Sequence, residues 1–132
     1  MKVLIKDKQY EGKEFYNRNI AQALEDSQSN GYIPLFMPKL IDQRTQNPKS
    51  KLLWNNWFIA PSLRATGQTS QGSKVVVYVH KENHFSNLNN VRTATIHLIN
   101  GAGIIPQEEF QKYINEDGKE EEGIRLVSVI PY

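Results

Sequence analysis

The residues from Trp54 to Ser86 read WNNWFIAPSLRATGQTSQGSKVVVYVHKENHFS, and this stretch decides how the chain folds. It holds both tryptophans, two of the three histidines and the longest β-branched run of the sequence. The run Val75–Val79 lacks the polar alternation of a strand that has one face in water. We therefore expect Val75–Val79 to be a central strand that is buried on both faces.

A β-hairpin is predicted around the start of this strand. Residues Ser62–Thr66 alternate between polar and apolar side chains, which is typical of a half-exposed strand. Residues Gly67–Ser73 contain two glycines among small polar side chains, which favours a hairpin loop between two strands. The sequence therefore predicts that the strand of Ser62–Thr66 lies beside Val75–Val79.

The N-terminal part predicts a strand, a helix and an edge strand. Val3–Ile5 is a short apolar run between lysines, which favours a strand. Lys13–Ser29 has apolar residues at helical spacing, and Asn30-Gly31 supplies a stop signal. Tyr32–Met37 is apolar, but its proline lacks a backbone donor, so we expect an edge strand or an extended buried segment.

Two shorter segments precede the hairpin. Pro38 is a suitable first residue for a short helix over Lys39–Thr45, with Leu40 and Ile41 expected to face inward. Leu52–Ile59 is rich in large apolar residues but is interrupted by two asparagines. It is compatible with one helical turn or with an irregular strand.

The C-terminal third supports further helices and a last strand. Ser86–Asn100 is β-branched, which favours a strand, yet its apolar spacing, an early cap and the closing Gly101 favour a helix, which we prefer. Pro106–Ile114 has proline first, acids early and a lysine late, as a helix dipole requires. Ile124–Ile130 predicts the last strand.

These elements predict an α+β fold. The chain of 132 residues has the usual size of one domain, and we expect residues 1–132 to form a single globular domain. The expected architecture is one mixed β-sheet of about four to six strands with about three helices packed on it.

Composition limits the classes of function. The chain contains no cysteine, which excludes disulfides and thiol chemistry and fits a cytoplasmic protein. No secretory signal is expected, and no apolar run approaches the roughly 18 residues of a membrane span. Residues 1–103 carry 13 Lys or Arg against 7 Asp or Glu, whereas residues 104–132 carry 3 against 7. The basic residues are scattered, so a nucleic-acid partner is not expected.

The first candidate site is a divalent metal site formed by His80, Glu82 and His84. If the strand stays extended beyond Val79, side-chain alternation places these three residues on one face. Two imidazoles and a carboxylate are suitable ligands for a divalent metal. A polar loop after the strand is the alternative, because asparagine and serine follow closely.

The second candidate is a ligand site on the strand before the hairpin loop. Alternation places Ser62, Arg64, Thr66 and Gln68 on one face, with His80 nearby. Arginine offers a planar fork that suits phosphate or carboxylate, and the hydroxyl and amide groups complete the shell. The alternative is the solvent-facing side of an ordinary hairpin.

The function predicted from these sites is a small-ligand domain, binding or enzymatic, for an anionic or phosphate-bearing molecule. The alternative is a protein–protein interaction or homo-oligomeric module with Trp54, Trp57 and Phe58 at the interface. A remote alternative is an ADP-ribosyltransferase-like enzyme. Arg64, Ser86 and Gln107-x-Glu109 follow the order of that family's Arg, Ser-Thr-Ser and Gln/Glu-x-Glu elements, although the full Ser-Thr-Ser element is missing.

Overall fold

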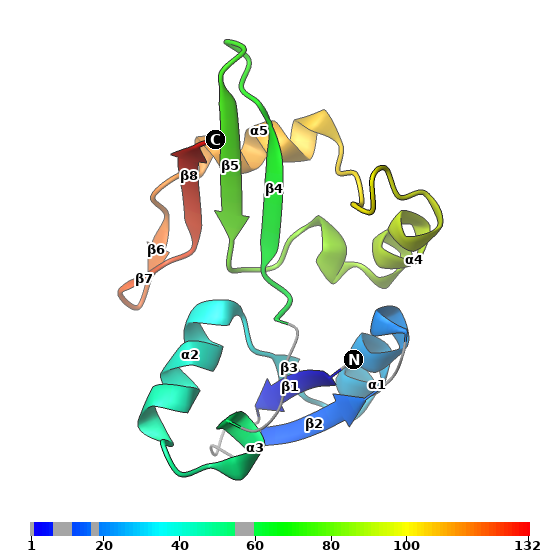
Figure 1. Cartoon of the computed structure of the whole chain (residues 1–132), viewed down its shortest axis with the longest axis vertical. Helices are drawn as coiled ribbons and strands as arrows, with labels where there is room; N and C mark the ends of the chain where they lie inside the picture. Colours follow the sequence, from blue (N-terminus) through cyan, green and yellow to red (C-terminus); the bar gives the residue numbers. More distant parts are fainter. Residues whose placement is uncertain (1, 7–11, 17–18, 55–59) are drawn as a thin grey trace. The chain divides into compact units, whose positions relative to one another are not determined.

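The computed structural model describes residues 2–6, 12–16, 19–54 and 60–132. They form two compact units, Met1–Pro61 and Ser62–Tyr132, each with its own sheet and helices (Figure 1). The predicted α+β class is confirmed. In place of one mixed sheet of about four to six strands, the described strands form two three-stranded antiparallel sheets and a two-stranded ribbon. No helix among these residues is long and apolar enough to cross a membrane.

The sheet of the first unit is antiparallel. Strand β1 (Lys2–Lys6) lies between β2 (Gly12–Tyr16) and β3 (Ile33–Pro34). Ile5 is paired with Pro34, and β3 is an edge strand, as the missing backbone donor of proline requires. The predicted first strand and the edge position are both confirmed.

Helix α1 (Ile20–Ser29) begins later than the sequence predicted. The expected helix started at Lys13, but the residues up to Tyr16 belong to β2 and pair with β1. Asn19 fixes the true start, because its side chain accepts hydrogen bonds from the N–H groups of Ala21 and Gln22. The predicted stop is confirmed: Asn30 caps the helix and Gly31 follows at a φ of +77°.

Two further helices complete the first unit, α2 (Met37–Gln46) and α3 (Lys51–Trp54). Leu40 is buried with Leu35 and Leu53 in a small core, as predicted for Leu40. Ile41 was expected to face inward but is exposed, because the one buried stripe of α2 passes through Leu40.

The aromatic residues of the predicted interface are only partly described. Trp57 and Phe58 lie outside the described residues. Trp54 ends α3 with about half of its surface exposed. Its ring Nε1 donates to the carbonyl of Asn47, and the guanidinium of Arg44 lies 5.8 Å from its ring centroid. Trp54 therefore packs against its own unit while part of the ring stays accessible.

The sheet of the second unit is built around β5 (Lys74–Val79), which lies between β4 (Leu63–Gln68) and β8 (Val127–Pro131). Val77 and Val79 are fully buried, and Val76 on the opposite face is buried as well. The predicted central strand is confirmed. The predicted hairpin is also confirmed, because β4 and β5 pair antiparallel across a short loop.

Helix α5 (Gln107–Asn115) lies across one face of this sheet (Figure 1). Phe110 and Tyr113 of α5 pack on Val77, Val79 and Val127 to form the core. The packing is so close that a Cβ at Gly67 would lie 2.9 Å from the ring of Phe110. Glycine at this strand position therefore leaves room for the helix to approach the sheet.

The segment Ser86–Asn100 is largely helical, so the predicted helix is confirmed over the alternative strand. A 3₁₀ turn, η1 (His84–Ser86), leads into α4 (Leu88–Ile96). The helix ends at Ile96, earlier than the predicted end near Gly101. After α5, two short strands, β6 (Glu120–Glu121) and β7 (Ile124–Arg125), form a ribbon ahead of β8.

We predict that Val77→Asp prevents stable folding of the second unit. A carboxylate at this fully buried position would have no partner, and its burial costs several kcal/mol against a total stability of roughly 5–15 kcal/mol. Thr66→Asp, on the exposed face of β4, is the matched control and should melt cooperatively. Circular dichroism melts of both variants test this, and an unchanged melt for Val77→Asp would show that β5 is not the core strand.

Candidate functional site

The arrangement of His80, Glu82 and His84 differs from the predicted metal site. Strand β5 ends at Val79, and His84 already belongs to the η1 turn, so the extended alternation that would align the three side chains is absent. Within the described residues, no group of three His, Asp or Glu side chains is placed to hold a metal ion. The polar loop, which was the alternative interpretation, is what the chain forms here.

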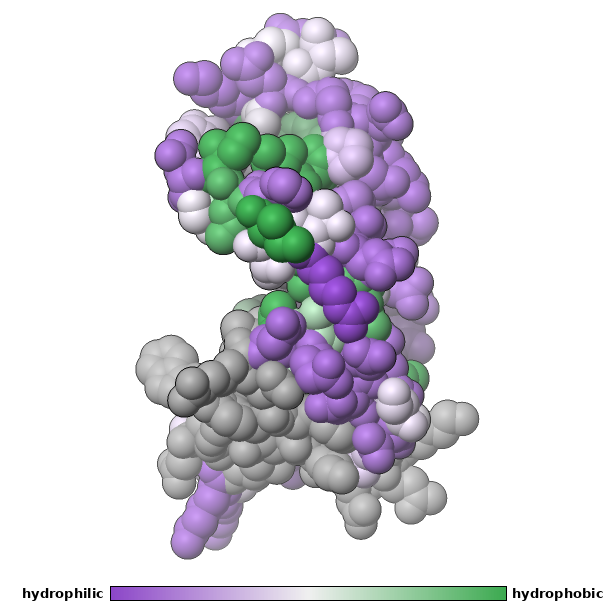
Figure 2. Space-filling view, turned by 90° about the vertical axis from the view of Figure 1, so that its right-hand side faces the viewer, coloured by the Kyte–Doolittle hydropathy of each residue, from purple (hydrophilic) through white to green (hydrophobic). Residues whose placement is uncertain are grey.

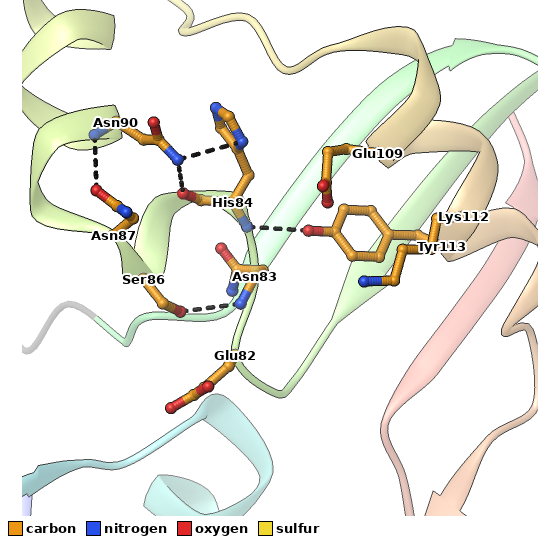
Figure 3. Close-up of a pocket in the computed structure, with 9 residues that line it drawn as sticks. All are labelled: Glu82, Asn83, His84, Ser86, Asn87, Asn90, Glu109, Lys112 and Tyr113. Carbon is orange, nitrogen blue, oxygen red and sulfur yellow. Dashed lines mark hydrogen bonds between the residues drawn. The ribbon is translucent and has the colours of Figure 1, made fainter.

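Instead, two of these three residues line a pocket of the second unit (Figure 3). The pocket has a volume of about 410 Å³ and is open to solvent. One wall comes from the loop after β5, from η1 and from the start of α4, and the other wall comes from α5. The lining residues are Glu82, Asn83, His84, Ser86, Asn87, Asn90, Glu109, Lys112 and Tyr113.

Asparagine caps build the first wall. The side chain of Asn83 accepts from the N–H of Phe85, while the hydroxyl of Ser86 accepts from the N–H of Asn83, which together form a capping box. Asn87 caps α4 by accepting from the N–H groups of Asn89 and Asn90. These local bonds fix the backbone of the wall, and Phe85 between the caps packs on the core.

Two further hydrogen bonds tie η1 to its neighbours. The amide of Asn90 donates to the carbonyl of His84 at 2.8 Å, which joins η1 to α4. The N–H of His84 donates to the hydroxyl of Tyr113 at 2.9 Å, which joins η1 to α5 across the pocket (Figure 3). Tyr113, whose ring belongs to the core, therefore holds the two walls of the pocket together.

The hydroxyl of Tyr113 is uncharged at neutral pH. Burial raises its pKa, and the nearby carboxylate of Glu109 raises it further. The bond from the N–H of His84 acts in the opposite direction. Because the ordinary value is already 10.0, the hydroxyl remains protonated at neutral pH, and it accepts the hydrogen bond from the N–H of His84.

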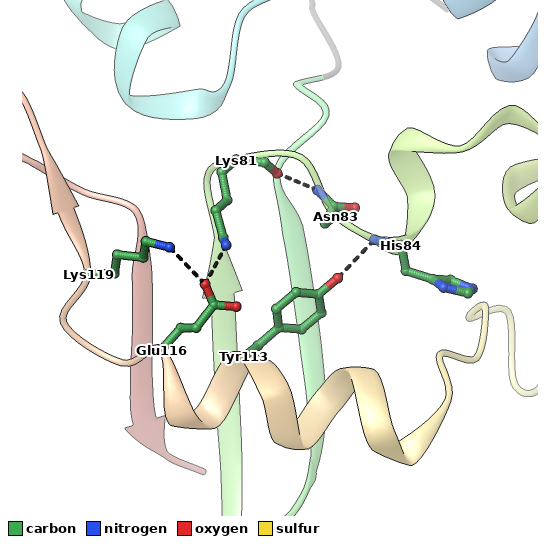
Figure 4. A network of polar contacts seen from close by, with 6 residues as sticks. All are labelled: Lys81, Asn83, His84, Tyr113, Glu116 and Lys119. Atoms are coloured by element: carbon green, nitrogen blue, oxygen red, sulfur yellow. Dashed lines mark hydrogen bonds and ion pairs between the residues drawn. The ribbon is translucent and has the colours of Figure 1, made fainter.

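An ion-pair network holds the base of the same loop (Figure 4). Lys81 and Lys119 both donate to Oε2 of Glu116 at the end of α5. The hydrogen bond from Lys81 is the main cause of the lowered pKa of Glu116, and Lys119 adds to it, whereas burial opposes it. The loop that carries Glu82 is thus attached to α5 at Tyr113 and, just beyond the helix end, at Glu116.

The pocket wall mixes hydrogen-bond acceptors and donors. Glu82 and Lys112 are the outward members, and neither side chain has a hydrogen bond or ion pair with another described residue. Glu109 contributes a second carboxylate beside the hydroxyl of Tyr113. The two glutamates and the one lysine of the lining give a formal charge of −1, which disfavours an anion in this pocket.

The predicted anion-binding residues lie on a different surface. Ser62 precedes β4, and Arg64, Thr66 and Gln68 occupy alternate positions of that strand with exposed side chains, as predicted. The Nε of Arg64 donates to the hydroxyl of Tyr78 at 3.4 Å. None of these residues lines the pocket, and they form an open sheet face.

His80 lies at the end of this face, beside Ser62. Its Nδ1 lies 2.9 Å from Oγ of Ser62, so the structure brings these two predicted residues together. Burial lowers the pKa of His80 from 6.5. The residues of the ADP-ribosyltransferase-like order do not meet in the same way, because Ser86 and Glu109 line the pocket whereas Arg64 does not.

Sequence reasoning missed most of the pocket residues. Asn83 and Asn87 were interpreted as loop or cap residues, and both cap a helical turn in the structure. Asn90 was assigned only to the predicted helix, and it lies in α4. Lys112 and Tyr113 were assigned only to the helix. The early Asn-x-x-Ser of residues 83–86 is the one sequence signal of a built turn at this place.

Comparison with known proteins identifies one informative likeness. The chain is similar to a solved structure described as "Accommodation of massive sequence variation in Nanoarchaeota by the C-type lectin fold", with a TM-score of 0.82 and 46% sequence identity. The match covers 96% of this chain and 57% of that protein, so the chain spans little more than half its length. No protein family and no curated protein matches the chain. The likeness supports an α+β fold of the C-type lectin kind, which is compatible with a binding or interaction module.

The half-buried His80 predicts a pH dependence of stability. Its pKa is lower in the folded chain than the ordinary 6.5, so the unfolded chain takes up the proton first as the pH falls. The contribution of the neutral His80 to the free energy of unfolding is therefore complete above about pH 6.5, and it is lost as the pH falls from there towards the folded pKa. We expect that the melting temperature of His80→Gln, which can still bond to Ser62, changes less with pH than that of the wild type between about pH 7.5 and 5.5.

His97→Gln is the matched control for this measurement, because the side chain of His97 is exposed. The carboxylate of Glu116 titrates below this window, since its pKa is lowered from 4.5. An equal pH slope in the wild type and in His80→Gln would contradict a role for the burial of His80.

Proposed function

We propose that the chain is a ligand-binding module in which the pocket between η1, α4 and α5 holds a small, neutral molecule rich in hydroxyl groups. The single observation that carries this proposal is the composition of the pocket wall, where two carboxylates, a lysine and a neutral tyrosine hydroxyl surround a volume of about 410 Å³. That volume lies in the usual range for small-molecule sites.

The mixture of groups favours hydroxyl-bearing ligands over anions or flat apolar ones. Each hydroxyl both donates and accepts, so it can donate to Glu82 or Glu109 and accept from Lys112. Hydrogen bonds to charged partners are worth more than neutral ones, about 1.5–3 kcal/mol each. The lack of apolar lining argues against an aromatic or aliphatic ligand, and the net negative charge argues against a phosphate.

The rigidity of the wall supports binding as well. The groups that face the opening are carried by backbone fixed through asparagine caps and through the bond between His84 and Tyr113. A wall that is already ordered loses little conformational entropy when a ligand enters. The likeness to a protein of the C-type lectin fold agrees with a binding role.

Glu109 offers the sharpest test of this pocket. Glu109→Gln keeps an oxygen for the hydroxyl of Tyr113 but removes the charge that would strengthen a ligand hydroxyl bond. We expect it to weaken the affinity for a neutral monosaccharide identified from a panel by roughly tenfold, which corresponds to one charged hydrogen bond. Isothermal titration or NMR titration of the isotope-labelled chain gives the affinity and the location.

The neighbouring Glu108→Gln is the matched control, because Glu108 is exposed on the same helix and does not line the pocket. It should leave the affinity unchanged. If no neutral sugar or polyol shifts the amide signals of residues 82–90, or if both variants bind like the wild type, the pocket is not the site.

A second proposal, an anion site on the open face of β4, is favoured by one observation: Arg64, Thr66 and Gln68 lie at alternate, exposed positions of β4, and Ser62 directly precedes the strand. Arg64→Ala should change the unfolding free energy by no more than about 0.5 kcal/mol, since the side chain is exposed. It should abolish any stabilisation of the melt by inorganic phosphate, and Arg64→Lys should do the same, because a point charge lacks the fork.

Lys74→Ala is the matched control for this second proposal. Lys74 pairs with Gln68 in the register and is also exposed, so it carries the same charge on the same face. Phosphate should still stabilise this variant. Equal stabilisation of the wild type and all three variants would show that Arg64 is not an anchor.

A further inference from the structure

Asparagine is followed by glycine at two places in the sequence, residues 30–31 and residues 100–101. An asparagine in this pair is open to attack by its own backbone, because glycine has no Cβ to shield its nitrogen. Both asparagines are exposed, and both glycines have positive φ, 77° at Gly31 and 80° at Gly101. Exposure and local sequence therefore do not distinguish the two pairs, and we compare their hydrogen bonds instead.

Asn100 and Gly101 are the central residues of a two-residue hairpin turn. Ile99 and Ala102 exchange two backbone hydrogen bonds, of 2.9 and 3.0 Å, on either side of them. The φ angles of 50° at Asn100 and 80° at Gly101 are those of a type I′ turn. Within the described residues, neither the side chain of Asn100 nor the N–H of Gly101 has a hydrogen bond.

The turn lies at the surface of the second unit. It follows α4, and Figure 2 shows apolar residues gathered at the surface on the side that carries this helix. Leu98 and Ile99, which precede the turn, are 50% and 59% exposed. Water and hydroxide therefore reach the amide groups of Asn100 and Gly101.

The peptide unit between Asn100 and Gly101 can rotate without loss of a hydrogen bond. A peptide unit is planar and rotates as one body, and this rotation converts a type I′ turn into a type II′ turn. The ψ angle of Asn100 then changes from about +30° to about −120°, and φ of Gly101 changes sign. Glycine accepts both signs of φ, and both turn types keep the bonds between Ile99 and Ala102.

The rotated turn has the geometry for an attack on the asparagine side chain. At a ψ of about −120° the nitrogen of Gly101 eclipses Cβ of Asn100 about the Cα–C bond. This nitrogen and Cγ of Asn100 are then on the same side of the backbone, so the two atoms can close a five-membered ring.

Asn30 is held away from this geometry. Its Nδ2 donates to the carbonyl of Asp26 at 2.7 Å, and the N–H of Gly31 donates to the carbonyl of Gln28 at 3.1 Å. The ψ angle of Asn30 is 8°, and the residue caps the C-terminal end of α1. Ring closure at Asn30 would break both bonds, so the end of the helix has to open before the reaction can occur.

We propose that Asn100 is a site of spontaneous deamidation in the folded chain, whereas Asn30 is protected. Hydroxide removes the proton of the Gly101 N–H, and the nitrogen forms a bond to Cγ of Asn100. The bond between Cγ and Nδ2 breaks, and Nδ2 leaves as ammonia with a proton from water, which restores the hydroxide and leaves a cyclic imide. Water then adds to one imide carbonyl and opens the ring. Aspartate forms if the new bond breaks, and isoaspartate forms if the original peptide bond breaks.

Either product changes the surface around the turn. A carboxylate appears in a stretch, residues 83–107, that contains no Asp or Glu. Isoaspartate also lengthens the backbone path by one carbon, two residues before Gly103. A Cβ at Gly103 would lie 3.1 Å from the ring of Phe85 and 3.1 Å from Cβ of Ala94, so the backbone packs closely against η1 and α4 there.

Peptide mapping measures the two sites separately, because trypsin leaves Asn30 on residues 19–39 and Asn100 on residues 93–112. The full chain is incubated at mildly alkaline pH, either folded or unfolded in urea, and mass spectrometry with fragment ions follows the deamidated fraction at each site. In the folded chain we expect Asn100 to react at least roughly tenfold faster than Asn30, because two hydrogen bonds must open at Asn30 first. In urea the two rates should be similar, since the protecting bonds are lost.

Two variants assign the acidic product to its site. Asn100→Gln needs a six-membered ring for the same reaction, so it should largely remove the acidic form that ion-exchange chromatography separates from the folded wild type. The matched control, Asn30→Gln, should accumulate this form like the wild type. Equal rates at the two sites in the folded chain, equal slowing of both sites by folding, or an acidic form that accumulates undiminished in Asn100→Gln would each overturn the proposal.

Discussion

The packing of α5 on β5 is the contact on which the second unit depends. Phe110 and Tyr113 cover Val77 and Val79, and the glycine at position 67 lets the helix approach the neighbouring strand. The same tyrosine reaches past the core with its hydroxyl and accepts the N–H of His84. One side chain thus joins the apolar core to the polar pocket, so the pocket geometry follows from the burial of the strand.

The pocket is a consequence of how the chain leaves the sheet. After Val79 one more backbone bond follows, from the N–H of His80 to the carbonyl of Leu126. Beyond His80, side chains satisfy several backbone groups of the loop. Asn83, Ser86 and Asn87 supply these bonds within a few residues, and Lys81 holds the loop to Glu116 of α5. These side-chain bonds act together with the packing of Phe85 on the core, and they leave a polar wall facing the helix.

The parts of the fold with a single physical interpretation were predictable from the sequence. The run Val75–Val79 has no explanation other than a buried strand, and alternation placed Arg64 on an open face. The predicted start of α1 was wrong. Tyr16 matches helical spacing by coincidence, whereas its pairing with β1 makes this residue part of a strand. The pocket could not be predicted, because Glu82 and Lys112 come from elements distant in sequence that only the packing of α5 brings together.

The asparagine caps have an evolutionary consequence. The wall is held by side chains that point back to their own backbone, whereas Glu82 and Lys112 point outward and support no part of the fold among the described residues. In the proposed binding role, selectivity and foldability would therefore reside in different residues of the same loop and helix. Exchange of the outward residues would then change what the pocket binds without an unstable intermediate.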